Sequence, residues 1–249
     1  MSGHSKWSTI KRKKEATDQK RSRTYAKLLR AVEVAAREGG GSVEANMTLA
    51  SAVEKARDFS VPTENIERAV KRGTGDLEGA RYEEVTFEGY GPGGVALLLE
   101  ALTDNRNRTG QEIRHAISKN GGSPGEPGST AWMFSRKGVI LVEKEAAPDE
   151  EALMEVVLEA GADDLADSES HWEITTEPSA FKPVREALSQ AGIRTASAEL
   201  TMSPQSTVRL EGGQAKGLLA LIDALEDLDD VQNVYANFDI SEAVLLETG

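Results

Sequence analysis

The chain has 249 residues, of which 39% are hydrophobic and 29% charged, and its formal net charge at pH 7 is −13. It contains no cysteine, which excludes disulfides and thiolate metal sites, and its three histidines are too scattered to indicate a metal cluster. No apolar run approaches the roughly 18 residues of a membrane helix, and the start lacks the apolar segment of a secretory signal. We therefore expect a cytoplasmic protein that uses no cofactor and no metal.

The charge is unevenly distributed along the chain. Residues 1–30 contain ten Lys or Arg and two acids, a net charge of +8, so the other 219 residues carry −21 (−13 − 8). Such asymmetry is typical of proteins that contact nucleic acid or a membrane at one end. A solvated helix face with a frayed tail would give the same pattern, and charge alone favours neither interpretation.

The first 75 residues are predicted to form a helical module with a basic arm. Apolar residues at helical spacing predict helices over 17–38 and 45–59. A third helix is expected to open at Pro62, because the N–H that proline lacks would have no partner in a first turn. Gly73 is expected to end this helix in the left-handed conformation.

Beyond residue 80 the pattern changes to strands. YEEVTFE and VALLLEAL are predicted strands joined by GYGPGG. The glycine-rich segment matches G-x-G-x-x-G, but a strand follows it where a dinucleotide site requires a helix, so a hairpin is the better interpretation. A helix should come next, opened by a capping box from Thr109 to Glu112 and closed by Gly121. After the loop GGSPGEPGST, a strand is expected at AWMF.

Residues 136–204 show the β-α-β-β-α-β order of a ferredoxin-like sandwich. Residues 205–249 add a strand, a helix and a strand, which are too few to stand alone, so they are expected to pack on residues 80–135. The predicted fold is therefore α+β and multidomain. A helical bundle (1–79) precedes an α/β domain (80–135 with 205–249), into which a ferredoxin-like α/β sandwich domain (136–204) is inserted.

The sequence contains no recognisable catalytic constellation. There is no G-x-x-x-x-G-K-[ST] loop and no G-x-S-x-G elbow. The acidic groups at 163–164 and 225–230 read as turn and helix-end residues, with nothing to indicate a carboxylate pair of shifted pKa. We expect a protein that is not an enzyme.

The segment TDNRNRT at 103–109 concentrates polar residues between a predicted strand and a predicted helix. Arginine forks and a helix N-terminus both suit phosphate. Alternatively, Asp104 and Asn107 satisfy local backbone groups in an ordinary connection. Both interpretations stay open, and the candidate binding loop comprises Asn105, Arg106, Asn107 and Arg108.

Several longer motifs resemble those of a known family. They are GHSKW at 3–7, NIERAVKRG at 65–73, EGYGPGGV at 88–95, LTDNRNRT at 102–109 and LEDLDDVQNVYANFD at 225–239. Together, in this order and over essentially the whole chain, they are similar to the YebC/PmpR family, whose mitochondrial relatives are translational activators of cytochrome c oxidase.

The resemblance implies three domains, one helical and two α/β. It also implies one of two functions. Family members have long been labelled DNA-binding transcriptional regulators, and more recently have been understood as ribosome-associated factors that help synthesis through proline-rich stalls. Where members often read GGNLG, this chain reads GGSPG at 121–125, followed by Pro127, so no role is transferred to that loop.

The favoured hypothesis is a translation factor that touches ribosomal RNA or tRNA. A slender basic arm fits a phosphate-lined site, and an indole stacks on an unpaired base with roughly 1–3 kcal/mol. The candidate contacts in the arm are His4, Lys6, Trp7, Lys11, Arg12, Lys13 and Lys14, and the basic surface would extend to Arg68, Lys71 and Arg72.

Two alternatives remain. A DNA-binding transcriptional regulator would dock its helical domain on duplex, although no helix-turn-helix recognition helix is recognisable and the −21 beyond residue 30 would repel a long duplex. A protein-interaction scaffold would use the arm as a solubilising tail, against which Trp7 argues, because an exposed indole in such a tail has no folding reason to be there. A separate alternative is that Trp7 packs on the helical domain. The sequence predicts no membrane partner, and it does not indicate an oligomeric state.

Overall fold

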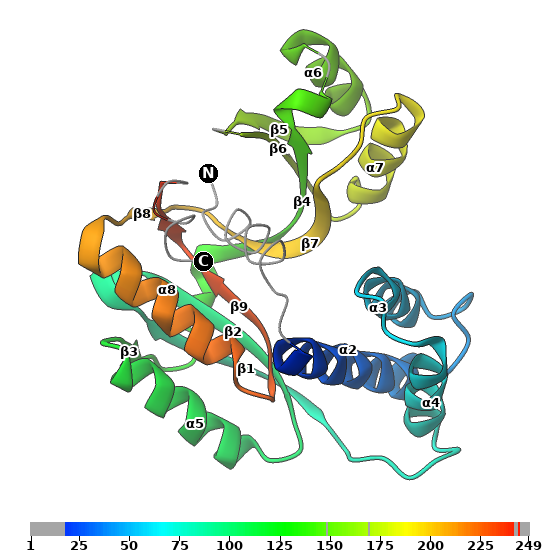
Figure 1. Ribbon diagram of the computed structural model, residues 1–249, viewed down its shortest axis with the longest axis vertical. Coiled ribbons are helices and arrows are strands. Elements are labelled where there is room, and N and C mark those ends of the chain that lie inside the picture. Colours follow the sequence, from blue (N-terminus) through cyan, green and yellow to red (C-terminus); the bar gives the residue numbers. More distant parts are fainter. Residues whose placement is uncertain (1–17, 148, 169, 242–243, 245–249) are drawn as a thin grey trace.

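The computed structural model describes residues 18–147, 149–168, 170–241 and 244. Figure 1 shows a helical module at lower right, a sheet backed by two long helices at lower left, called the middle sheet below, and a second sheet-and-helix layer at the top. Among the described helices, none is long and apolar enough to cross a membrane.

The helical module packs three helices around a small apolar core that includes Val32, Leu49 and Ile66. Buried Asn46 joins two of them, because its side chain donates to the carbonyls of Ala35 and Gly40 and accepts from the Leu49 backbone N–H. One amide thus satisfies the end of one helix and caps the next. The helices are α2 (Asp18–Gly39), α3 (Met47–Asp58) and α4 (Thr63–Thr74).

The end of α4 differs from the sequence-based prediction. Gly73 does not adopt the left-handed conformation, which belongs to Gly75 (φ 86°). Gly73 is buried within the helix, where an added Cβ would lie 2.4 Å from the Glu33 carbonyl oxygen and 2.7 Å from Ala36 Cβ. The glycine therefore allows α4 to approach α2 closely. Pro62 precedes the helix as its N-cap instead of occupying its first turn.

The middle sheet contains the predicted hairpin. Antiparallel strands pair Glu83 with Thr103 and Tyr90 with Ala96, and GYGPGG closes the turn through a short 3-10 segment, η1 (Pro92–Gly94). The sheet order is β3-β1-β2-β9. The strands are β1 (Glu83–Tyr90), β2 (Ala96–Thr103), β3 (Ser123–Pro124) and β9 (Val231–Ala236).

Two helices cover one face of this sheet, α5 (Arg106–Lys119) and α8 (Gly212–Glu226). Leu97 and Leu99 of β2 and Val234 of β9 pack there against Ile113 and Leu218. The predicted capping box at 109–112 is wrong. The helix begins one turn earlier, capped by Asn105, and Thr109 turns its hydroxyl into the protein interior.

The second sheet has the order β5-β6-β4-β7 with antiparallel neighbours, as a ferredoxin-like sandwich requires. The separate strand predicted at AWMF does not form, because Ala131–Met133 form a 3-10 turn (η2) and Phe134 begins β4, which runs on into residues 136–204. The elements are β4 (Phe134–Glu143), η3 (Lys144–Ala146), α6 (Glu150–Glu159), β5 (Ala162–Asp167), β6 (His171–Thr176), α7 (Phe181–Gln190) and β7 (Ser197–Pro204).

The C-terminal segment returns to the middle sheet. The two-residue strands β8 (Val208–Arg209) and β10 (Phe238–Asp239) pair in parallel, while β9 joins β2. The predicted fold class, α+β with a helical module followed by two α/β parts, is confirmed. The domain limits at 79/80, 135/136 and 204/205 stay a prediction.

The contact at Gly73 gives a test of the α2–α4 packing. Alanine favours a helix interior over glycine by about 1 kcal/mol, but at this site its methyl group would collide with backbone. We expect Gly73→Ala to destabilise the protein by about 1–3 kcal/mol, measured by denaturant unfolding.

The matched control is Gly213→Ala in α8, where an added Cβ meets no atom within 4 Å. There we expect a gain of about 0.5–1 kcal/mol, because alanine loses less backbone entropy than glycine. A neutral or stabilising effect at Gly73 would contradict the close approach.

Candidate nucleic-acid interface

The predicted arm contacts His4, Lys6, Trp7, Lys11, Arg12, Lys13 and Lys14 lie outside the described residues. Residues 1–17 are called the N-terminal arm below. The structure therefore addresses the two other predicted basic groups, on α4 and after β2, and the helix to which the arm is attached.

On α4 the predicted cations have different surroundings. Arg68 and Lys71 are exposed. Arg72 instead donates from Nε to Oε2 of Glu33 at 2.8 Å, and Arg37 donates to the other oxygen of that buried carboxylate at 3.1 Å. Arg72 therefore contributes to the α2–α4 contact, which leaves Arg68 and Lys71 as the more accessible cations of this set.

In the candidate loop at 105–108, two residues are bound by neighbouring groups and two are exposed. Asn105 caps α5 by accepting from the Arg108 backbone N–H at 3.1 Å. The Arg108 side chain is about half exposed and donates to Asp104 at 2.9 Å and to Asp230 at 2.7 Å. Arg106 and Asn107 are exposed. Local structure thus accounts for Asn105 and Arg108, although the residue that satisfies a backbone N–H is Asn105 and Asp104 binds the Arg108 side chain instead. A binding role for the loop stays a prediction.

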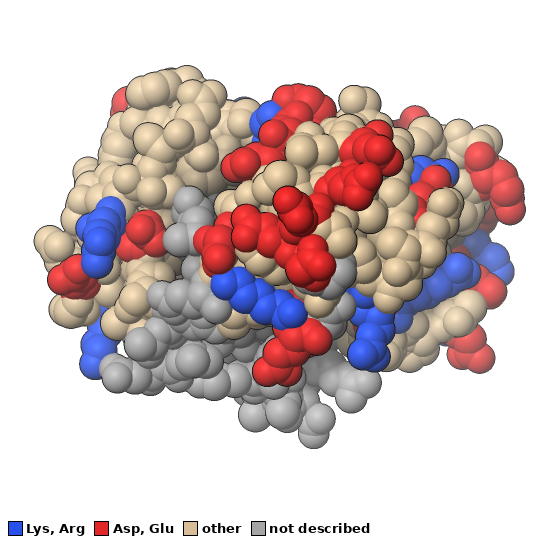
Figure 2. All heavy atoms as spheres, turned by 90° about the horizontal axis from the view of Figure 1, so that it is seen from above, with Lys and Arg blue, Asp and Glu red and all other residues tan. Residues whose placement is uncertain are grey.

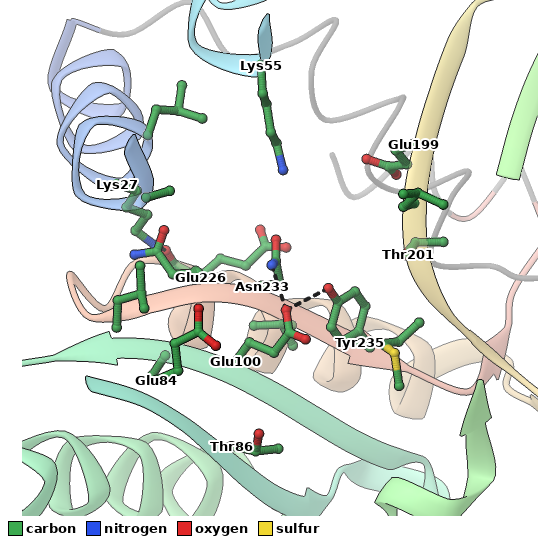
Figure 3. A pocket seen from close by; sticks show the side chains of 18 of the residues that line it. Lys27, Lys55, Glu84, Thr86, Glu100, Glu199, Thr201, Glu226, Asn233 and Tyr235 are labelled. Atoms are coloured by element: carbon green, nitrogen blue, oxygen red, sulfur yellow. Dashed lines mark hydrogen bonds between the residues drawn. The ribbon is translucent and has the colours of Figure 1, made fainter. Parts of the chain in front are cut away.

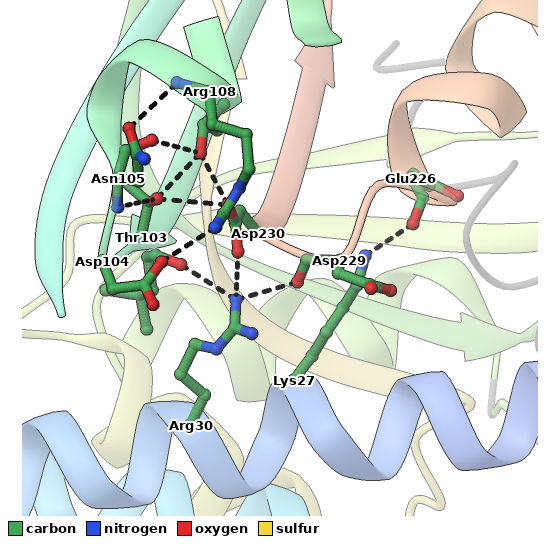
Figure 4. Close-up of polar contacts among 11 residues, drawn as sticks. Lys27, Arg30, Thr103, Asp104, Asn105, Arg108, Glu226, Asp229 and Asp230 are labelled. Atoms are coloured by element: carbon green, nitrogen blue, oxygen red, sulfur yellow. Dashed lines mark hydrogen bonds and ion pairs between the residues drawn. The ribbon is translucent and has the colours of Figure 1, made fainter. Parts of the chain in front are cut away.

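Asp230, which is only 4% exposed, is the centre of a polar cluster between the helical module and the middle sheet (Figure 4). Its Oδ2 accepts hydrogen bonds from Thr109 Oγ1 (2.6 Å), Arg108 Nη2 (2.7 Å) and Thr103 Oγ1 (3.1 Å). Its Oδ1 accepts from Arg30 Nη1 of α2 at 2.8 Å. We call these five residues the Asp230 network.

Arg30 also binds backbone on the other side of the junction. Its Nη1 lies 2.9 Å from the Leu102 carbonyl oxygen and 3.0 Å from that of Asp229, and its guanidinium stacks 4.7 Å from the centre of the Tyr82 ring. Removing Arg30 would leave acceptors from β2 and from the turn before β9 without this donor. The residue therefore fixes the helical module against the sheet.

Arg30 belongs to a basic face of α2. Arg23, Lys27 and Arg30 recur at helical spacing and meet the acidic end of α8 and the turn after it. Arg23 pairs with Asp227 at 3.3 Å, and Lys27 donates to the Glu226 carbonyl oxygen at 2.5 Å. In the described part of residues 1–30, these three cations thus bind the protein itself, and the charge asymmetry of the sequence partly reflects an internal contact.

The network also determines the ionisation of its members. Burial opposes the charged form of Asp230, but the hydrogen bonds from Thr109, Arg108 and Thr103 outweigh it and lower the pKa of Asp230 below its usual value. The same hydrogen bond to Asp230, followed by the one to Asp104, raises the pKa of Arg108. The cluster is therefore a charged, fully hydrogen-bonded junction at neutral pH.

The loop after α5 is held by a different carboxylate. Glu88 of β1 accepts from the backbone N–H groups of Gly128 (2.6 Å), Thr130 (2.5 Å) and Ala131 (2.8 Å). These bonds lower the pKa of Glu88, although burial acts in the opposite direction. Trp132 follows directly with 65% of its surface exposed and donates from Nε1 to the Ser129 carbonyl oxygen at 3.1 Å.

Sequence reasoning missed both carboxylates as organising residues. The sequence alone predicts helix-end residues at 225–230, and the signal for their partners is the spacing of Arg23, Lys27 and Arg30. Glu88 carries no comparable signal, because its partners are backbone amides 40 or more residues away. In the described part of the chain, no group of His, Asp or Glu is arranged to hold a metal ion.

The fold and this junction define a class of multidomain α+β protein in which a helical N-terminal module is fixed to an α/β body. Residues 5–76 match the family described as "TACO1/YebC protein N-terminal domain", and residues 82–238 match "TACO1/YebC second and third domain". The chain belongs to the TACO1/YebC family.

Individual relatives agree over nearly the full length. A protein of Rubrobacter xylanophilus is 58% identical over 99% of both chains, and one of Geobacter sulfurreducens is 55% identical over 97% of both. Each is named a probable transcriptional regulatory protein. The crystal structure of a conserved hypothetical protein from Aquifex aeolicus has a TM-score of 0.78 and 44% identity, covering 90% of this chain and 93% of that one.

The Asp230 network predicts a pH-dependent stability. Asp230→Asn removes the charge that holds Arg30 and Arg108, and we expect a loss of about 3 kcal/mol at pH 7. Because the folded pKa of Asp230 is lowered, its stabilisation is complete above the unfolded pKa of about 4 and is lost as pH falls through the folded value. The free-energy difference between the two proteins should therefore shrink below about pH 4 in urea titrations.

The control is Asp227→Asn, which removes the carboxylate of the exposed pair with Arg23. Such pairs are worth about 0–1 kcal/mol. If both substitutions cost the same, or if the Asp230 effect does not change with pH, the assigned role of Asp230 is wrong.

Proposed function

We propose that this protein is a non-enzymatic regulator of gene expression that acts in the cytoplasm as a ribosome-associated translation factor. It grips ribosomal RNA or tRNA with its N-terminal arm and relieves stalling at proline-rich sequences. The observation that carries the proposal is the contrast between the net charge of +8 in residues 1–30 and −21 in the rest. The choice of a stalled ribosome as the target comes from the resemblance to the YebC/PmpR family.

The contacts made by the basic face of α2 bear on which cations we assign to RNA. Arg23, Lys27 and Arg30 are engaged with the acidic turn of the body. The seven other cations of residues 1–30 all precede this contact in sequence, at positions 6, 11, 12, 13, 14, 20 and 21. We therefore assign the contact with a polyanion to the cations nearer the start of the chain, which precede the contact between α2 and the acidic turn.

The body favours a narrow contact over a broad one. Residues 136–204 contain fifteen Asp or Glu and six Lys or Arg, and Figure 2 shows acidic side chains spread over the face seen from above. Exposed carboxylates on α6 include Glu150, Glu151, Glu155 and Glu159. A long nucleic acid lying along this face would be repelled, whereas a narrow RNA site would admit the arm alone.

The proposed mechanism is positional. Lys11, Arg12, Lys13 and Lys14 neutralise backbone phosphates, and Trp7 stacks on an unpaired base. Arg68 and Lys71 extend the basic surface from α4. The protein makes and breaks no bond; it stabilises a tRNA or ribosomal RNA geometry in which peptide-bond formation proceeds.

A DNA-binding transcriptional regulator is the second candidate, and the names of the relatives favour it. In that case the helical module and the arm would dock on duplex while the α/β parts recruit a partner. The acidic body argues against it, because a duplex is a long and uniformly charged ligand.

A competition separates the two candidates. Protein at physiological salt is mixed with ribosomes and an excess of duplex DNA and then sedimented. We expect co-sedimentation with ribosomes, and its loss when residues 1–14 are removed or when Lys11, Arg12, Lys13 and Lys14 are all replaced by Gln.

The matched control replaces four exposed cations elsewhere with Gln, namely Lys182, Arg194, Arg209 and Lys216. It changes the net charge equally and should leave ribosome binding intact. Retention on DNA with bare ribosomes would favour the transcriptional regulator, and loss of binding in the control would contradict a specific role for the arm.

Trp7→Ala tests the stacking contact. We expect RNA affinity to fall about 5–150-fold, which corresponds to roughly 1–3 kcal/mol per stacked base, with the midpoint of thermal unfolding unchanged. A lower unfolding temperature with unchanged RNA affinity would show instead that Trp7 packs on the helical module.

A further inference from the structure

The three parts of the molecule enclose a cleft of about 950 Å³. Its floor is the face of the middle sheet opposite α5 and α8, where Glu84, Glu100 and Tyr235 lie (Figure 3). Helices α2 and α3 form one wall, and β7 with the start of β4 forms the other. The cleft thus brings together segments that are far apart in the sequence.

Carboxylates outnumber cations in the cleft. The lining cations are Arg23, Lys27, Lys55 and Arg136, and the lining carboxylates are Glu38, Glu84, Glu100, Glu199, Glu226 and Asp227, so the net charge is −2. Arg23 is paired with Asp227. This balance disfavours a nucleic acid inside the cleft and favours a cationic occupant.

Three of these carboxylates, Glu38, Glu84 and Glu100, form no salt bridge with any described residue. Glu100 accepts neutral hydrogen bonds from Asn233 Nδ2 (2.8 Å) and Tyr235 Oη (2.9 Å). Burial raises the pKa of Glu84, and the neighbouring charges of Glu38 and Glu100 raise it further. A cation on the floor would relieve this repulsion.

The cleft also offers apolar surface. Leu200 of β7 is 41% exposed, and half-buried Met202 and Phe59 line the same space. An occupant that combines several cations with an apolar side chain or two would match both features.

We propose that the N-terminal arm, residues 1–17, docks in this cleft when no nucleic acid is bound. The arm contains five Lys or Arg, one acid, Trp7 and Ile10. Its charge is opposite to that of the cleft, and Trp7 and Ile10 match the exposed Leu200 and its neighbours.

The point of attachment supports this occupant over a segment of another protein. The described chain starts at Asp18, and Arg23, five residues later on α2, already lines the cleft. At 1.5 Å per helical residue, this is about 8 Å along the axis. Lys11–Lys14 precede Asp18 by four to seven residues, a reach of up to about 25 Å. Tethering gives the arm an effective concentration in the millimolar range.

Docking would make the cleft a competitor of RNA for the same cations. A polyanion that binds the arm weakly would not displace it from the cleft, whereas a high-affinity RNA site would. Non-specific binding of the protein to nucleic acid would therefore be reduced. This consequence rests on the proposed function, whereas the docking itself does not require that the arm bind RNA.

Limited proteolysis tests the docking in the full-length protein without nucleic acid. Trypsin cuts after Lys11–Lys14, and intact-mass measurements follow the loss of the arm. We expect the double substitution Glu84→Gln and Glu199→Gln to accelerate this cut at least threefold. The control Glu155→Gln and Glu159→Gln, on the exposed face of α6, changes the net charge equally and should cut at the wild-type rate. Equal rates in all three proteins would overturn the proposal.

A second measurement reports position directly and uses the absence of native cysteine. Ser8→Cys combined with Thr86→Cys on the cleft floor should form a disulfide under mild oxidation. Ser8→Cys combined with Ser118→Cys, exposed on α5, should not. Equal yields in the two pairs would overturn the docking.

Loss of docking with intact RNA binding would leave the proposed function standing, and docking without RNA binding would reject that function alone.

Discussion

A buried carboxylate on the turn before β9 holds the molecule together. Asp230 receives hydrogen bonds from α2, from the end of β2 and from the first turn of α5, and a lone ionised group at such a depth would be strongly unfavourable. Each partner is therefore needed, and the positions of the helical module, the hairpin and α5 depend on one another.

Much of the fold could be predicted from the sequence, because it follows from local periodicity. The ferredoxin-like order and the GYGPGG hairpin are read from alternation and turn residues alone. The errors arise where tertiary contacts override local rules. Gly73 looks like a cap but is required by a close helix contact, and Thr109 looks like a capping residue but its hydroxyl is bound to Asp230.

The candidate site was less accessible to sequence reasoning, for a physical reason. Arg72 and Arg108 match the composition of a nucleic-acid surface, and their carboxylate partners, Glu33 and Asp230, are 39 and 122 residues away. Composition counts cations without showing which of them already have a counterion. Once the internal pairs of the described residues are considered, Arg23, Arg72 and Arg108 no longer count fully toward the charge offered to an external polyanion.

The anchoring of the loop after α5 has a consequence for ligands. Three amides that converge on one point form the kind of concavity that holds phosphate in many proteins, but here Glu88 occupies it. The Glu88 carboxylate of β1 takes the place of a bound anion and holds the loop in this conformation without a ligand. Its exposed Trp132 is thus presented by a preassembled support, and contact with a partner would incur little cost for ordering the backbone.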